Sequence, residues 1–238
     1  MMAPSGRRPR RISADDLADY GMVAGRSVDV EKAARGLGVS KRVVKQVLSE
    51  AQGTQSNMFF QKLSGRVEAD TSGKGGVRGM LQAAFGKGPR GGAVDARAAA
   101  KELGVSPNTV RRWTAGTQKP SPEHLKAVQG ASRRAASTQR GRRGATTDFR
   151  SSAQGKRALR VGGTLSISGM QGPEGDELYK RDRRITKEIS AEQLEAMFDA
   201  YERGGDRALH DWMLDFTQGY VSGWEFQSID EIEFGDRS

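Results

Sequence analysis

The sequence predicts an α-helical N-terminal half built from two helix-turn-helix units, followed by a small α+β domain at the C-terminal end. Two observations predict the helical half: a helix-turn-helix pattern at residues 93–116, and a second copy of this pattern 66 residues earlier. A third observation predicts the C-terminal domain, because the apolar spacing changes from helical to alternating after residue 159.

The chain has 238 residues and a formal net charge of +10, and this charge is unevenly distributed. Residues 188–238 hold thirteen acidic and three basic side chains, so the positive excess lies in the preceding residues. Such a basic body favours a polyanionic partner, and nucleic acid is the most economical one. There is no cysteine, and no apolar run is long enough to span a membrane. We therefore expect a cytoplasmic, nucleoid-associated protein without a membrane partner.

The chain begins with a basic tail, residues 1–12, which holds four arginines and no apolar segment typical of a secretory signal. Residues 13–64 are then predicted to form the first helix-turn-helix unit. Residues 28–47 align without a gap on residues 94–113, with nine identities in twenty that include the whole LGVS turn. This indicates an internal duplication, although two convergent helical hairpins remain the alternative. The outward face of this unit would bind DNA through Lys41, Arg42, Lys45 and Gln46.

Residues 65–76 are polar and rich in glycine, which predicts a linker before the second helix-turn-helix unit at residues 77–128. In that unit Gly104 occupies the turn, and Ser106 is placed to cap the second helix. Val110 and Trp113 follow at the spacing of an inward-facing pair. The residues left to contact bases and phosphates are Ser106, Asn108, Thr109, Arg111 and Arg112.

Residues 129–158 have many arginines among glycine, serine and alanine, with hardly a large hydrophobic residue, so they are expected to form a basic flexible linker. The α+β domain is expected at residues 159–235. Residues 159–169 alternate as a strand would, residues 179–189 can return as a second strand, and Ser190 with Gln193 forms a capping box for a helical pair. An acidic strand at residues 224–234 closes the domain.

No catalytic machinery is evident in the sequence. The chain has only two histidines, at positions 124 and 210, and neither has a partner at a spacing typical of a metal or catalytic site. The acidic residues around Ile232 are better explained as the solvent-exposed face of a strand than as a metal site. We therefore expect no enzyme activity, no metal and no cofactor.

The segments GVRGMLQAAFG and DARAAAKELGVSPNTVRRWTAGTQKPSPEHL resemble the DNA-binding part of the telomere terminal proteins of actinobacterial linear chromosomes and plasmids. The RDRRIT segment, the helical pair and the closing WEFQSIDEIEF are similar to the C-terminal domain of that family. The resemblance covers about residues 75–235, and the first helix-turn-helix unit is an addition to it.

The resemblance implies that the protein binds the telomeric ends of a linear replicon and primes end patching. In this family a hydroxyl accepts the first deoxynucleotide from a DNA polymerase, so that the protein stays covalently attached to the DNA 5′ end. The polymerase and a telomere-associated protein are the implied partners. The corresponding hydroxyls belong to Thr164, Ser168 and Ser166, which we expect on a mobile, positively charged segment.

The main alternative is a helix-turn-helix regulator of transcription or plasmid maintenance. Its C-terminal domain would then mediate homo-oligomerisation and would have no role in priming. A third alternative is a structural protein that binds a basic surface of a partner through its acidic C-terminal domain.

Overall fold

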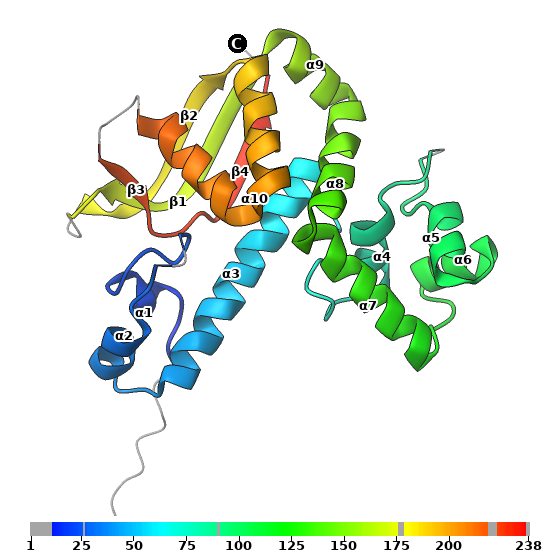
Figure 1. Cartoon of the computed structure of the whole chain (residues 1–238), viewed down its shortest axis with the longest axis horizontal. Coiled ribbons are helices and arrows are strands. Elements are labelled where there is room, and N and C mark those ends of the chain that lie inside the picture. Colours follow the sequence, from blue (N-terminus) through cyan, green and yellow to red (C-terminus); the bar gives the residue numbers. More distant parts are fainter. Residues whose placement is uncertain (1–10, 26, 90, 176–178, 219–222, 237–238) are drawn as a thin grey trace, which may run out of the picture.

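The computed structural model describes residues 11–25, 27–89, 91–175, 179–218 and 223–236. Within these ranges the chain forms ten helices and a small antiparallel sheet near the C-terminus (Figure 1). A mostly helical chain with strands only towards its end is what the sequence predicts. Residues 1–10 of the expected basic tail lie outside the described residues, and Ile12, the last residue of that tail, is buried in the core of the first unit.

The first helix-turn-helix unit contains α1 (Asp15–Ala18), α2 (Val30–Leu37) and the first half of α3 (Lys41–Ser64). Its small core includes Leu17, Ala33 and Val44, all fully buried. The 24-residue α3 then runs out of this unit, and its far end buries Phe59 and Leu63 in the core of the C-terminal region. One helix therefore connects the first unit directly to the C-terminal region (Figure 1).

The second unit contains α4 (Val77–Phe85), α5 (Ala96–Leu103), α6 (Pro107–Ala115) and the first half of α7 (Pro122–Ser137). Its core packs Met80 and Leu81 of α4 against Val110 and Trp113 of α6. The connection over residues 65–76 is irregular, as its composition predicts. It is nevertheless packed, because Ala69 is buried beside Phe60 of α3.

The prediction of a flexible linker over residues 129–158 is wrong. This stretch is helical: it completes α7 and forms α8 (Gln139–Ser151) and most of α9 (Ala153–Val161). Small buried side chains such as Ala135 and Ala145 let α8 pack closely against its neighbours, so a core forms without many large hydrophobic residues. Thr138 and Ser152 accept hydrogen bonds from the first turns of α8 and α9, which fixes where each helix begins.

The sheet contains β1 (Gly163–Pro173), β2 (Arg181–Ile189), β3 (Trp224–Phe226) and β4 (Glu231–Gly235), all antiparallel to β1. β1 is the central strand, with β2 on one side and both β3 and β4 on the other. The acidic segment expected as one closing strand is therefore two short strands, which pair with opposite ends of β1.

The helix α10 (Ala191–Gln218) covers the apolar face of the sheet (Figure 1). Leu165 and Ile167 of β1 pack there with Leu194, Phe198 and Met213 of α10. The predicted capping box is confirmed, since the Gln193 N–H donates to Ser190 Oγ and the Ser190 N–H donates to Gln193 Oε1. The predicted helical pair is present as α10, which has a kink at Gly205, where φ is 65°.

Candidate nucleic-acid interface

The turn between α5 and α6 has the geometry that its sequence predicts. Gly104 ends α5 in the left-handed conformation, with φ 67° and ψ 30°, where a side chain would be strained. Two residues later the Ser106 Oγ accepts a hydrogen bond of 3.1 Å from the Thr109 N–H, and Pro107 occupies the first position of α6. These local signals set both the end of α5 and the start of α6.

The inward and outward sides of α6 are also as predicted. Val110 is fully buried and Trp113 is 4% exposed, so these two side chains hold α6 against α4 and α5. Asn108, Arg111 and Arg112 are exposed on the opposite side. Among the residues that the structure describes, these three side chains have no hydrogen-bond or ion-pair partner, so they are free to contact a ligand.

Ser106 and Thr109 differ from these three residues. Their hydroxyl oxygens lie 2.9 Å apart and share a hydrogen bond, while Ser106 also caps the helix. Both side chains are therefore engaged in holding the first turn of α6. Ser106 is exposed and Thr109 is half-buried, so they sit beside the outward face but contribute fewer free donors to it.

The first unit repeats this turn closely. Gly38 has φ 66° and ψ 32°, and Ser40 has φ −75° and ψ 151°, within a few degrees of Gly104 and of Ser106 in the second unit. The Ser40 Oγ accepts from the Val43 N–H, as Ser106 does from the equivalent residue of α6. The aligned residues therefore adopt one local structure, as the predicted duplication requires.

The outward faces of the two units are not equivalent. Lys41 forms an ion pair with Glu31, and Gln46 donates a hydrogen bond of 3.0 Å to Glu50. The lysine holds the pKa of Glu31 below its usual value. Only Arg42 and Lys45 of the predicted contacts are exposed without a partner among the described residues. The outward face of the first unit is therefore partly neutralised, whereas the equivalent face of the second unit stays basic.

The predicted acceptor hydroxyls lie on the polar face of the sheet. Thr164, Ser166 and Ser168 are all in β1, which is paired with β2 and with β4 along this stretch. The expectation of a mobile segment is therefore wrong, since a central strand has hydrogen-bonded neighbours on both sides. The alternating sequence of this segment was enough to predict a strand. It did not indicate that the strand lies at the centre of the sheet.

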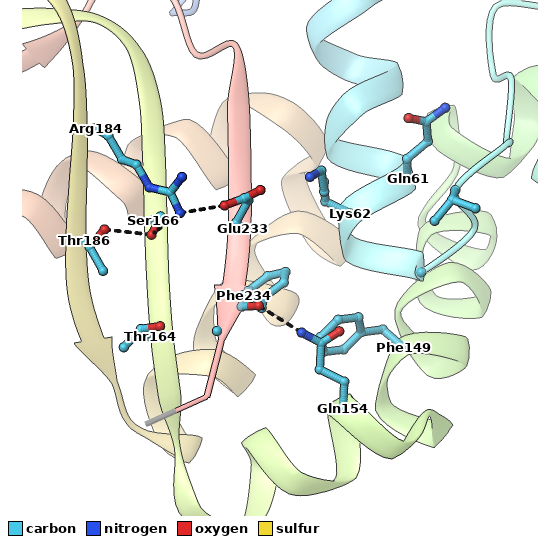
Figure 2. A pocket seen from close by; sticks show the side chains of 13 residues that line it. Gln61, Lys62, Phe149, Gln154, Thr164, Ser166, Arg184, Thr186, Glu233 and Phe234 are labelled. Carbon is cyan, nitrogen blue, oxygen red and sulfur yellow. Dashed lines mark hydrogen bonds and ion pairs between the residues drawn. The ribbon is translucent and has the colours of Figure 1, made fainter. Parts of the chain in front are cut away.

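A cleft of about 510 Å³ lies over this polar face, between β1 and the ends of α3 and α8 (Figure 2). Ser166 is 5% exposed at its edge, and its hydroxyl is held by Thr186 at 2.7 Å and Arg184 at 3.2 Å. Arg184 also forms an ion pair of 2.6 Å with Glu233. Lys62 from α3 faces the same cleft and pairs with Glu231.

Thr164 lines this cleft in a different way. Its side chain is half-buried, and its hydroxyl has no hydrogen-bond partner among the described residues. The neighbouring strand carries Gly235, where an added Cβ would lie 2.5 Å from Thr164 Oγ1. The absence of a side chain at Gly235 therefore keeps space open beside this hydroxyl. Ser168 lies on the same face beyond the cleft and is also half-buried.

Comparison with known proteins agrees with the geometry of the second unit. Residues 95–130 match the sequence profile of the helix-turn-helix family, which covers α5, α6 and the first part of α7. This segment is a helix-turn-helix domain both by sequence and by structure. No curated protein and no solved structure gave a significant match to the chain.

The described part of the chain contains no cluster of three or more histidine, aspartate or glutamate side chains that could hold a metal ion. No helix within the same ranges is long and apolar enough to cross a membrane. The helix-turn-helix domain and the cleft over β1 hold the site residues predicted from the sequence.

Proposed function

We propose that this protein binds duplex DNA in a sequence-specific manner, with α6 as the helix that enters the major groove. The observation that carries this proposal is the free outward face of α6, formed by Asn108, Arg111 and Arg112. An asparagine amide can bond both N6 and N7 of adenine, and an arginine can bond both O6 and N7 of guanine. The helix-turn-helix match over residues 95–130 supports the same function.

Selection of bound duplexes from a random pool tests this proposal. Asn108→Ala and Arg111→Ala are each expected to weaken discrimination at one base position by about 1–3 kcal/mol. Arg160→Ala is the control, because it removes one exposed charge from α9, away from α6. Its base preference should equal that of the wild-type protein. A wild-type protein that selects no sequence from the pool would contradict the proposal.

We further propose, from the family resemblance, that the protein is a telomere terminal protein with Thr164 as nucleotide acceptor. Two features of the cleft over β1 support Thr164 among the three candidates. The Thr164 side chain is half-buried and its hydroxyl has no partner among the described residues, whereas the Ser166 hydroxyl is hydrogen-bonded to Thr186 and Arg184. Gly235 on the neighbouring strand also carries no side chain, which leaves the space beside the Thr164 hydroxyl open.

In this reaction Thr164 Oγ1 attacks the α-phosphorus of the first deoxynucleoside triphosphate. The new oxygen–phosphorus bond forms as the bond to the β-phosphate oxygen breaks, so pyrophosphate leaves and the hydroxyl proton passes to solvent. The DNA polymerase supplies the catalysis, and this chain serves as the primer. Binding through α6 would bring the hydroxyl to the telomeric end.

Transfer of a labelled deoxynucleotide tests the acceptor. The full chain is incubated with a telomeric template, its DNA polymerase and the telomere-associated protein. Thr164→Val keeps the branched shape of the side chain and should abolish labelling, whereas Ser168→Ala and Ser166→Ala should retain it. Labelling of Thr164→Val at the wild-type level would exclude Thr164 as the acceptor.

The same experiment separates the alternative, a helix-turn-helix regulator whose C-terminal region makes a dimer. A regulator would select a DNA sequence through α6 but accept no label with any polymerase. Sequence selection alone therefore does not distinguish the two functions, and the covalent adduct does.

A further inference from the structure

A second cleft, of about 530 Å³, lies between α3 and α7, the helices that begin in the first and the second helix-turn-helix unit. Its walls come from the middle of α3, the end of α7, the start of α8 and the kink of α10, which meet at the centre of the molecule in Figure 1. We call it the arginine cleft, after the three arginines that line it. Its lining includes Ser56, Arg133, Ser137, Arg142, Asp206 and Arg207.

The charge of the arginine cleft is positive, since three guanidinium groups face one carboxylate, that of Asp206. Arg142 is 8% exposed, and all of its hydrogen bonds go to main-chain carbonyl oxygens of α7 and α10. It is therefore a fixed part of the wall. Arg133 and Arg207 are exposed and have no hydrogen-bond or ion-pair partner among the described residues, so both can bind a ligand.

Neutral donors surround these two arginines. The hydroxyl groups of Ser56 and Ser137 line the arginine cleft and have no partner within the described ranges. Free guanidinium groups and free hydroxyls together match the acceptor oxygens of a phosphate group.

The position of the arginine cleft points to the source of the phosphate. Ser56 lies on α3, which begins in the first helix-turn-helix unit, and Arg133 lies on α7, which begins in the second. Arg133 follows the matched helix-turn-helix segment, residues 95–130, by three residues, so the cleft adjoins the unit that presents α6. Phosphate contacts outside the groove position a protein on DNA without reading its sequence.

We propose that the arginine cleft binds a backbone phosphate of the duplex held by α6, with Arg133 and Arg207 as the phosphate ligands. This inference rests on the proposed DNA binding by α6. It adds a contact that fixes the register of the protein on the duplex. The two arginines should strengthen binding to any sequence equally and steepen the dependence of affinity on salt.

The salt dependence of duplex binding tests this inference on the full chain. The double variant Arg133→Ala, Arg207→Ala is expected to lower the slope of log affinity against log salt by about 2, one for each lost phosphate contact. Its base preference should stay that of the wild-type protein. The matched control is Lys156→Ala, Arg160→Ala, which removes two exposed charges from α9 and should change the slope much less.

Equal slope changes in the two double variants would overturn the inference, because bulk charge would then explain both. If the alanine variant unfolds at a lower temperature, the double variant Arg133→Gln, Arg207→Gln repeats the test with longer uncharged side chains. Binding of inorganic phosphate, followed by calorimetry, distinguishes the source. Loss of phosphate binding in the double variant with an unchanged DNA slope would assign the cleft to a small phosphorylated ligand and overturn the DNA contact. A wild-type protein that selects no sequence would instead refute the role of α6.

Discussion

Arg142 on α8 donates two hydrogen bonds, of 3.1 and 2.9 Å, to the carbonyl oxygen of Glu202 on α10, sixty residues later. The same guanidinium donates a bond of 3.0 Å to the carbonyl of Ala136 at the end of α7. Both carbonyls belong to the last turn of a helical segment, where they lack intrahelical partners and carry partial negative charge. One buried side chain therefore caps two helices and joins three elements.

Arg142→Met should lower the free energy of unfolding by about 2–4 kcal/mol, because it leaves buried carbonyl groups without donors. Urea unfolding followed by circular dichroism measures the change. Arg140→Met is the matched control, since Arg140 is exposed on the same helix, and its effect should stay within about 0.5 kcal/mol. An equal effect of the two substitutions would show that Arg142 contributes only as one charge among many.

Arg142 also explains why the region around α8 could not be predicted from composition. Its arginines indicated a solvated, flexible linker, whereas the structure uses Arg142, Arg143 and Arg150 to hold α8 against Glu202 of α10. The partner carboxylate lies more than fifty residues later in the chain. Composition alone therefore cannot show that such a stretch is packed. The local signals at Thr138 and Ser152, which cap α8 and α9, were available in the sequence.

The helix-turn-helix units could be predicted much better, because their determinants are local. In each unit the turn glycine, the capping serine and the buried valine, Val44 or Val110, lie within twenty residues of one another. The position of Thr164 was harder to predict. Its alternating neighbours indicate a strand, but pairing of β1 with β4 joins residues about seventy positions apart. The sequence therefore predicts the candidate hydroxyls but not the cleft that Thr164 and Ser166 line.

Two glycine substitutions should have opposite effects on stability. Gly104→Ala forces a side chain into a left-handed backbone conformation and should destabilise the protein by about 1 kcal/mol. Gly144→Ala should stabilise it by about 0.5–1 kcal/mol, because Gly144 lies in α8 and its exposed side has open space for a methyl group. Thermal unfolding of the two variants checks the signs. Destabilisation by both would mean that contacts rather than backbone conformation decide the outcome.

The two units should differ in their contribution to DNA affinity. Arg111→Ala is expected to reduce the affinity for a selected duplex by about 1–3 kcal/mol, since this side chain belongs to the free face of α6. Lys45→Ala changes the equivalent residue of α3, and its cost should be below about 1 kcal/mol, as for a phosphate contact on a partly neutralised surface. Fluorescence anisotropy with the same duplex compares them directly. A larger effect of Lys45→Ala would make the first unit the main reader of DNA.

His210 should make the stability of the protein depend on pH below neutrality. The side chain is 2% exposed on α10, its Nε2 is buried without a partner in the described part of the chain, and its ring meets the Phe226 ring edge-on. Burial lowers the pKa of His210 below the usual value of 6.5, and the Asp211 carboxylate, 3.8 Å away, opposes this only in part. The unfolded chain therefore binds a proton at a higher pH than the folded chain.

The sign of the effect follows from this order of proton binding. The contribution of His210 to stability is complete above the unfolded pKa and is lost as the pH falls through 6.5 towards the folded pKa. His210→Leu should remove that loss, so its free energy of unfolding should fall less than that of the wild-type protein between about pH 7 and pH 5. The carboxylates that titrate at lower pH are common to both proteins and cancel in the comparison. Asp211→Asn should steepen the loss, because it removes the carboxylate that favours the protonated ring. Equal slopes for all three proteins would show that His210 keeps its usual pKa in the folded chain.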